Sequence, residues 1–164
     1  MSASTTDVKT DLVQDGQATE LFEAMSDLIR IYQFRDRDRT YCHGISVSQC
    51  YALEAVARHG PLTVNQLAAY LYVGKSTVSR LVEGMVQKEL VLRQPHPDDR
   101  RSLLVTLTEV GSRVHYRILE EYLERERELL AEFAPEVRPD LIAFIRRLAA
   151  TATKNATTGP SDCG

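Results

Sequence analysis

The sequence predicts a mainly α-helical fold that contains one small β-hairpin, an α+β arrangement. Apolar residues recur at three- and four-residue steps through most of the chain, which is the period of an amphipathic helix. Ser46 and Thr63 are each followed three residues later by Gln, which is the pattern of a helix-capping box. Two β-prone segments, 91–93 and 103–107, flank a stretch rich in Pro, Asp and Arg, as the strands of a hairpin flank its turn.

Length and composition suit a single domain. The 164 residues, with a hydrophobic content of 43%, are enough for one ordinary globular core. We expect a polar lead-in over 1–17, one domain over 18–152 and a flexible tail over 153–164. The lead-in has no basic segment followed by an apolar one, and no apolar run approaches the roughly 18 to 20 residues of a membrane span. These features predict a cytoplasmic protein without a membrane partner.

The apolar pattern predicts helices over residues 18–35, 46–59, 63–71, 75–90, 108–133 and 141–150. The charged cluster 35–39 and then Gly44 interrupt the pattern after the first of them. The third and fourth helices are short and are joined by the turn 72–74, which is the arrangement of a helix-turn-helix. Because a hairpin with a charged tip follows, we predict a winged helix-turn-helix whose DNA-binding lobe covers 46–107.

The helix that begins at Lys75 has two chemically different faces. At about 100° per residue, the apolar side chains share one face and most polar ones lie opposite. The apolar set is Val78, Leu81, Val82 and Met85, and the polar set is Ser76, Arg80, Glu83 and Gln87, flanked by Thr77 and Ser79. Small hydroxyls let a helix enter the major groove of DNA, and Arg can pair with guanine. The alternative is a solvated amphipathic helix without a ligand.

The hairpin tip carries the sequence Asp98-Asp99-Arg100-Arg101. A guanidinium at such a tip can enter a narrow minor groove, and a neighbouring carboxylate can hold it in the needed rotamer. The alternative is a cluster of surface ion pairs that contributes little. The net charge of −3 argues against nucleic acid, but residues 74–102 hold six basic and four acidic side chains and are locally positive.

The stretch 67–111 resembles the multiple-antibiotic-resistance regulator (MarR) family. It reads LAAYLYVGKSTVSRLVEGMVQKELVLRQPHPDDRRSLLVTLTEVG, with S-T-V-S-R-L-V in the helix, D-R-R in the wing and L-T-x-x-G after the second strand. The resemblance implies DNA contacts from Ser76, Thr77, Ser79 and Arg80, with Lys75 counted among them. It also implies that Asp99 orients the wing and that Arg100 or Arg101 enters the minor groove. Gly74 departs from the family pattern, which often has Ser there as the helix cap.

The resemblance further implies a two-fold homodimer in which the first helix and the last two interlock. Residues 18–40 and 108–152 would be the dimerisation helices. The sequence supports this independently, because these helices carry apolar stripes and a chain of this length has too little else to cover them. Such a dimer presents two recognition helices about one turn of DNA apart, roughly 34 Å. The expected partner is therefore double-stranded DNA with a near-palindromic operator.

Cys42, His43 and Cys50 form a cluster that the fold does not require, and Cys163 in the tail could join it. Thiolates near His could bind a soft metal or metalloid ion, or be oxidised. The alternative is that Cys50 is a small core residue. The His residues are too scattered for a metal-ligand run, so a metal site is not assigned and no cofactor is required. Aromatic side chains could instead line a pocket for a small ligand, or belong to the core and the interface: Phe22, Tyr32, Tyr41, Tyr51, Tyr70 and Tyr72.

These features favour a dimeric transcriptional repressor, released from its operator by a small ligand, a soft metal(loid) ion or thiol oxidation. The alternative is a winged-helix protein-interaction module without DNA binding, which the acidic net charge favours. We expect no enzyme activity, because the sequence contains no G-x-S-x-G, no Gly-rich phosphate loop and no H-E-x-x-H.

Overall fold

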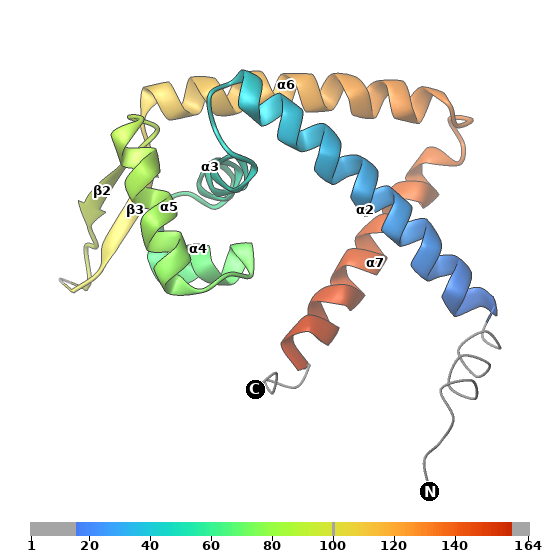
Figure 1. Ribbon diagram of the computed structural model, residues 1–164, viewed down its shortest axis with the longest axis horizontal. Coiled ribbons are helices and arrows are strands. Elements are labelled where there is room, and N and C mark those ends of the chain that lie inside the picture. The colour runs from blue at the N-terminus through green and yellow to red at the C-terminus, as the bar shows by residue number, and fades with distance from the viewer. Residues whose placement is uncertain (1–15, 100, 159–164) are drawn as a thin grey trace, which may run out of the picture. The chain divides into compact units, whose positions relative to one another are not determined.

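The computed structural model describes residues 16–99 and 101–158, and their side chains except at 35–42 and 155–158. The chain divides into two compact units, one up to Ile118 and one from Leu119. The elements in chain order are α2 (Gly16–Cys42), α3 (Val47–His59), β1 (Leu62–Thr63), α4 (Val64–Leu71), α5 (Lys75–Gln87), β2 (Val91–Pro95), β3 (Leu103–Leu107), α6 (Glu109–Ala131) and α7 (Arg138–Thr158) (Figure 1). The boundary between the units falls within α6.

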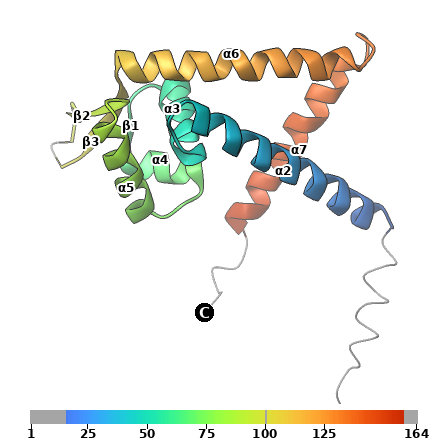
Figure 2. The ribbon, with the colours of Figure 1, turned by 45° about the horizontal axis from the view of Figure 1, so that its top comes forward.

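A three-stranded antiparallel sheet in the order β1-β3-β2 closes one side of the first unit (Figure 2). The predicted hairpin is confirmed, with Val91 opposite Leu107 at its base and Pro95 opposite Leu103 near its tip. The third strand was not predicted. It pairs Leu62 with Val105 and therefore brings the start of α4 beside the hairpin.

The predicted helix starts are confirmed by their caps. The Ser46 hydroxyl accepts from the Gln49 N–H at 3.2 Å, and the Gln49 side chain accepts from the Ser46 N–H at 3.1 Å. The same reciprocal pair joins Thr63 and Gln66. At the start of α6 the Thr108 hydroxyl accepts from the Gly111 N–H at 2.9 Å. Each cap satisfies a backbone donor that the first turn of a helix leaves unbonded.

The core of the first unit draws on three helices and two strands of the winged helix. Its largest fully buried side chains come from α3, α4, α5, β2 and β3, namely Leu53, Leu67, Val78, Val82, Met85, Val91 and Val105. The turn between α4 and α5 begins at Tyr72, which has a left-handed backbone (φ 54°), and Gly74 then caps α5 without a side-chain hydrogen bond. The winged helix-turn-helix predicted from the sequence is therefore the fold of this unit.

Two predicted helix ends differ from the structure by more than a turn, and in addition α5 ends and α7 begins about three residues before the predicted positions. The prediction that the charged cluster 35–39 interrupts the first helix is wrong, because α2 continues to Cys42. Arg favours helix, and the backbone first turns left-handed at Gly44 (φ 69°). At the other end α7 runs to Thr158, so the flexible tail expected from Thr153 does not begin there. Residues 1–15 and 159–164 lie outside the described part of the chain.

The second unit contains the remainder of α6 and all of α7. The Arg138 side chain donates to the carbonyl of Phe133 at 3.0 Å and so closes the turn between the two helices. Pro139 lies in the first turn of α7, where its missing N–H costs no hydrogen bond. None of the helices in the described residues is both long enough and apolar enough to cross a membrane.

The close approach of Gly111, on α6, to the backbone of Leu90, just after α5, predicts how much a substitution at Gly111 would destabilise the fold. A Cβ atom added at Gly111 would lie 1.9 Å from the carbonyl oxygen of Leu90, which is a backbone atom that cannot turn aside. We expect Gly111→Ala to lower the free energy of unfolding by about 3 kcal/mol. Gly84→Ala is the matched control, because its Cβ would meet only the end of the Gln49 side chain, at 3.4 Å. It should be neutral or stabilising by up to about 1 kcal/mol. Urea unfolding measures both, and equal stability of the two variants would contradict this packing.

Candidate nucleic-acid interface

The orientation of α5 is set by its apolar face. Val78, Val82 and Met85 are completely buried, whereas Ser76, Thr77 and Arg80 are exposed. A rotation that turned the polar set inward would expose the buried set to water and would also strand hydroxyl and guanidinium groups in the core. The first two turns of α5 therefore present hydroxyls and one guanidinium to solvent, together with the exposed side chain of Lys75.

Ser79 lies differently from the other residues that sequence reasoning assigned to DNA. It is half-buried, and its hydroxyl donates to the carbonyl of Lys75 at 3.0 Å, within its own helix. Its backbone carbonyl accepts from the guanidinium of Arg93, on β2, at 3.4 Å. Arg93 thus joins the hairpin to the middle of α5. Sequence reasoning missed this role, although it counted Arg93 among the basic residues of the segment.

The tip of the hairpin is organised around the carboxylate of Asp99. One oxygen of this carboxylate accepts from the Arg101 backbone N–H at 3.0 Å, and the other accepts from the Ser102 hydroxyl at 2.6 Å. The Ser102 N–H donates back to the Asp99 carbonyl at 3.0 Å, and His96 N–H donates to the Ser102 carbonyl at 3.1 Å. These bonds fix the backbone on which the exposed Arg101 side chain stands. Arg100 lies outside the described residues.

The same hydrogen bonds lower the pKa of Asp99. The largest cause is the bond from the Ser102 hydroxyl, followed by the bond from the Arg101 N–H, and nearby His96 adds a smaller electrostatic effect in the same direction. All three favour the charged carboxylate. Because the pKa is lower in the folded tip than in the unfolded chain, the stabilisation is present at neutral pH. It is lost as the pH falls through the folded-state pKa.

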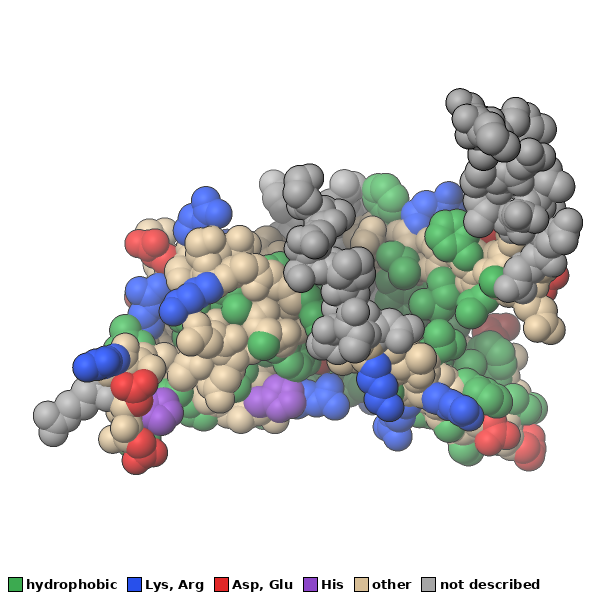
Figure 3. Space-filling model, turned by 90° about the horizontal axis from the view of Figure 1, so that it is seen from below, with side chains coloured by type: hydrophobic (Ala, Val, Ile, Leu, Met, Phe, Trp, Pro, Cys, Tyr) green, Lys and Arg blue, Asp and Glu red, His purple; other side chains and the backbone are tan. Residues whose placement is uncertain are grey.

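Both polar features lie on one side of the first unit. Figure 1 shows that α5 begins on the same side as the turn that joins β2 to β3. Figure 3 looks onto this side, where several Lys and Arg side chains lie at the end of the molecule that carries the wing, with Asp and Glu side chains beside them. The arrangement gives a locally positive surface on a chain whose net charge is −3. Phosphate neutralisation by such a surface is the main source of affinity for DNA.

Three hollows lined by described residues border α5 on this unit. The largest of these three, about 400 Å³, lies between α5 and the start of α3 and is lined in part by Tyr51, Thr77 and Arg80. A second, about 350 Å³, lies between α5 and the hairpin and contains Arg80 and Arg93. The third, about 200 Å³, lies between the starts of α4 and α5 and the wing tip. Side chains that reach into these hollows can hold polar or aromatic groups of a ligand.

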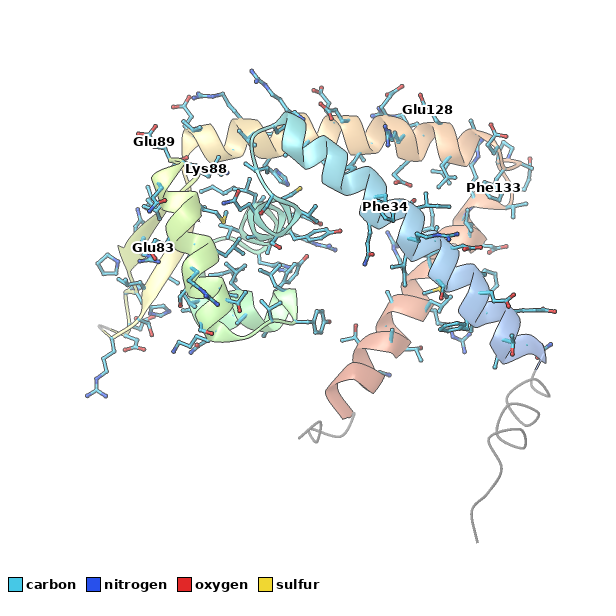
Figure 4. The ribbon with its side chains drawn as sticks, viewed as in Figure 1. Phe34, Glu83, Lys88, Glu89, Glu128 and Phe133 are labelled. Atoms are coloured by element: carbon cyan, nitrogen blue, oxygen red, sulfur yellow. The ribbon has the colours of Figure 1, made fainter. Side chains whose placement is uncertain are left out.

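Lys88 belongs to a different surface from the other basic residues of 74–102. Figure 4 labels it at the C-terminal end of α5. Its Nζ donates to the Gly44 carbonyl at 2.7 Å and to the Gln49 side-chain oxygen at 3.0 Å. Gln49 is buried, and its oxygen also accepts from the Ser46 N–H. Lys88 therefore ties the end of α5 to the turn between α2 and α3, although the sequence alone grouped it with the DNA-facing charges.

The residues proposed for sensing are only partly described. Cys50 is buried in the first turn of α3, with 6% of its surface exposed, and His43 is half-buried. The side chain of Cys42 and all of Cys163 lie outside the described residues. Within the described part of the chain, three or more His, Cys, Asp or Glu side chains nowhere gather as a metal site would require. Burial of Cys50 suits the core interpretation of that residue.

Comparison with known proteins agrees with this geometry. The model of the MarR family matches residues 43–102, which run from the turn before α3 to the wing tip. The chain is 32% identical over 93 residues to an uncharacterized HTH-type transcriptional regulator, YwoH, of Bacillus subtilis, covering 57% of this chain and 67% of that protein. The chain belongs to the MarR family.

Further comparisons concern a second regulator and a solved structure. The HTH-type transcriptional regulator PecS of Dickeya dadantii is 30% identical over 87 residues, and the match spans 53% of this chain but only 52% of that relative. A MarR family protein from Bacillus stearothermophilus superposes with a TM-score of 0.77 at 24% identity, over 85% of this chain and 97% of that one. The latter likeness concerns the fold alone.

The wing tip gives a test that is independent of DNA. We expect carboxyl NMR titration of this MarR protein to place the pKa of Asp99 below its ordinary value. In Ser102→Ala the pKa should rise toward the ordinary value, because the largest of the stabilising bonds is removed. Thr106→Ala, on β3 and outside the tip, is the control and should leave the Asp99 pKa unchanged. An identical Asp99 titration in wild type and Ser102→Ala would show that the tip is not built on this bond.

Proposed function

We propose that this protein is a sequence-specific DNA-binding regulator of transcription. In this proposal α5 enters the major groove and the β2–β3 hairpin enters the adjacent minor groove. The observation that carries it is the placement of Ser76, Thr77 and Arg80 on the exposed start of α5, on the same side as the wing tip. Hydroxyls and a guanidinium at the start of a helix are the groups that read base edges in the major groove.

The charge distribution supports DNA over a protein partner. Lys75, Arg80 and Arg101 come from two separated segments and are exposed, and Lys75 and Arg101 line one hollow. The carboxylate of Asp99 accepts bonds from the Arg101 N–H and the Ser102 hydroxyl, and so it orders the backbone on which the Arg101 cation stands. An acidic remainder of the chain weakens nonspecific binding but leaves a docked positive surface effective. The alternative, an interaction module without DNA binding, gives no reason for cations to gather at the starts of α5 and of the strand that follows the wing tip.

The contribution of Arg80 separates the two alternatives. We expect Arg80→Ala to weaken binding to an operator from the protein's own promoter region by about 10- to 100-fold, because one Arg-to-guanine contact is lost. Arg113→Ala removes the same charge from the start of α6, where Arg113 pairs with Glu109 at 2.8 Å, and should change the affinity little. Fluorescence anisotropy at about 100 mM salt measures both against random duplex. Equal affinity of wild type for operator and random duplex, or of Arg80→Ala and wild type for operator, would leave the interaction module as the better account.

We also propose that the protein acts as a homodimer through α2, α6 and α7. These helices expose large apolar side chains well beyond the scattered ones of an ordinary surface, among them Phe22, Ile31, Leu123, Phe144 and Ile145. A two-fold dimer would present two copies of α5 about 34 Å apart and would fit a near-palindromic operator. Dimerisation also doubles the number of phosphate contacts, which offsets the small positive surface of one chain.

Substitution of exposed aromatic side chains on α2 and α7 tests the proposed dimer. Phe22 on α2 and Phe144 on α7 are 71% and 66% exposed in one chain. We expect Phe22→Glu and Phe144→Glu to shift the mass in sedimentation equilibrium from twice 18.5 kDa toward 18.5 kDa, because a buried interface charge has no partner there. Val86→Glu makes the same change at an exposed position of α5 and should leave the mass unchanged. A dimer that survives both phenylalanine substitutions would contradict this interface.

The remaining part of the proposal is that the protein is a repressor and that binding of a small ligand releases it from its operator. The hollow of about 400 Å³ beside α5 supports it, because a ligand there would touch Thr77 and Arg80, which are proposed to contact DNA. Tyr51 offers an aromatic wall and Arg80 a positive charge, which together suit a small aromatic acid. The burial of Cys50 gives less support to a soft metal(loid) ion or thiol oxidation at that residue. Loss of operator affinity on adding such acids, with Tyr51→Ala resistant, tests this part.

A further inference from the structure

The smallest hollow beside α5 has a lining suited to an anion. It is formed by three elements that are distant in sequence, and its lining residues are Thr63, Val64, Asn65, Lys75, Ser79, Arg101, Ser102 and Leu103. Two of them are cations, and none of the described residues that line it is acidic. By contrast, the neighbouring hollow of about 350 Å³ includes the carboxylate of Glu83. The volume of about 200 Å³ suits a small group and not a drug-sized ligand.

The walls of this hollow are held in place from each side. Pairing of Thr63 with Leu104 fixes the start of α4 beside the wing strand β3. The capping box of Thr63 and Gln66 fixes the first turn of α4, where Asn65 is exposed. Asp99 holds the backbone of Arg101 and Ser102 on the opposite wall. The site is therefore shaped before a ligand arrives, which reduces the entropy lost on binding.

The hydroxyls of the lining already make bonds within the protein. Ser79 donates to the Lys75 carbonyl, Thr63 donates to the Gln66 side chain, and Ser102 donates to Asp99. An anion in the hollow would therefore be bound by the ammonium of Lys75, the guanidinium of Arg101 and the side-chain amide of Asn65. Charged donors of this kind make the stronger hydrogen bonds to phosphate oxygens.

The geometry of duplex DNA identifies the anion. The major and minor grooves are separated by the sugar-phosphate strands, so a protein with a helix in one groove and a wing in the next must let one strand pass between them. The hollow lies between the start of α5 and the wing tip. We propose that it seats one phosphodiester group of that strand, with Lys75, Arg101 and Asn65 as its ligands. The proposal rests on the DNA-binding function proposed above and names a contact, Asn65, outside α5 and the wing.

The proposed phosphate site of Lys75, Arg101 and Asn65 is called the seat below. A scan of the operator with single methylphosphonates tests it, since each methylphosphonate removes one phosphate charge. In wild type we expect one position per half-site, between the major-groove and minor-groove contacts, at which the substitution weakens binding about tenfold. In Asn65→Leu and Lys75→Met the unmodified operator should bind less tightly. The further loss from the methylphosphonate at that position should then fall to about fivefold or less, because each variant has already lost part of the same contact while the remaining ligands keep the rest.

Two controls make the result specific. Lys88→Met removes an equal charge from a lysine whose Nζ bonds to Gly44 and Gln49, and it should keep the full tenfold penalty at the seat position. The slope of log affinity against log salt should also fall by about 1 for each seat in Lys75→Met. If both Asn65→Leu and Lys75→Met keep the wild-type penalty at every position, the seat is wrong although DNA binding stands. If wild type prefers no duplex at all, the proposed function fails first.

Discussion

The complete burial of one face of α5 is the constraint on which the interface depends. Val78, Val82 and Met85 have no exposed surface, and each contributes about 1.5–3 kcal/mol that a rotation of the helix would forfeit. The exposed residues at the start of the helix take no part in this packing, yet the packing decides where they point. The inner face thus specifies the direction of Arg80, and the outer face is left to vary in chemistry without loss of the fold.

The wing is held to α5 by covalent connection and by the sheet. Strand β1 pairs with β3, so the start of α4 lies beside the hairpin, and Arg93 on β2 reaches the Ser79 carbonyl. Behind the helix, Lys88 links its end to the turn before α3. Two of these contacts hold α5 itself, one to the hairpin and one to the turn before α3, and the third holds α4 to the hairpin. Recognition helix and wing therefore form one body within the first unit, as a protein needs if it is to contact two grooves in a fixed register.

Much of this could be predicted from the sequence, because the signals concerned are local. Capping boxes at Ser46 and Thr63 and the period of apolar residues located the helices, and the turn residues located the hairpin. Strand β1 was missed because two residues carry no period, and its pairing is made with a partner some forty residues away. The charged cluster after Phe34 was misread as a break, since alternating charge does not itself end a helix.

The roles of the side chains likewise divide into those that local sequence predicts and those that depend on tertiary contacts. Exposure of Ser76 and Arg80 followed from helical geometry alone. The contacts of Arg93 and Lys88, and the place of Asn65 beside the wing, depend on which elements meet in space. Composition could count these residues as polar or basic, but only the tertiary arrangement distinguishes a lysine that faces DNA from one that bonds to a turn.

Chemical footprinting of the operator tests the central claim most directly, because it reports both grooves in one experiment. The account predicts that the bound protein protects guanine N7 atoms in the major groove in two patches about one turn of DNA, or roughly 34 Å, apart. It also predicts protection of the minor groove outside each patch from hydroxyl radicals. Protection of only one groove, or of a single unrepeated patch, would contradict the claim that α5 and the wing of a dimer grip both grooves together.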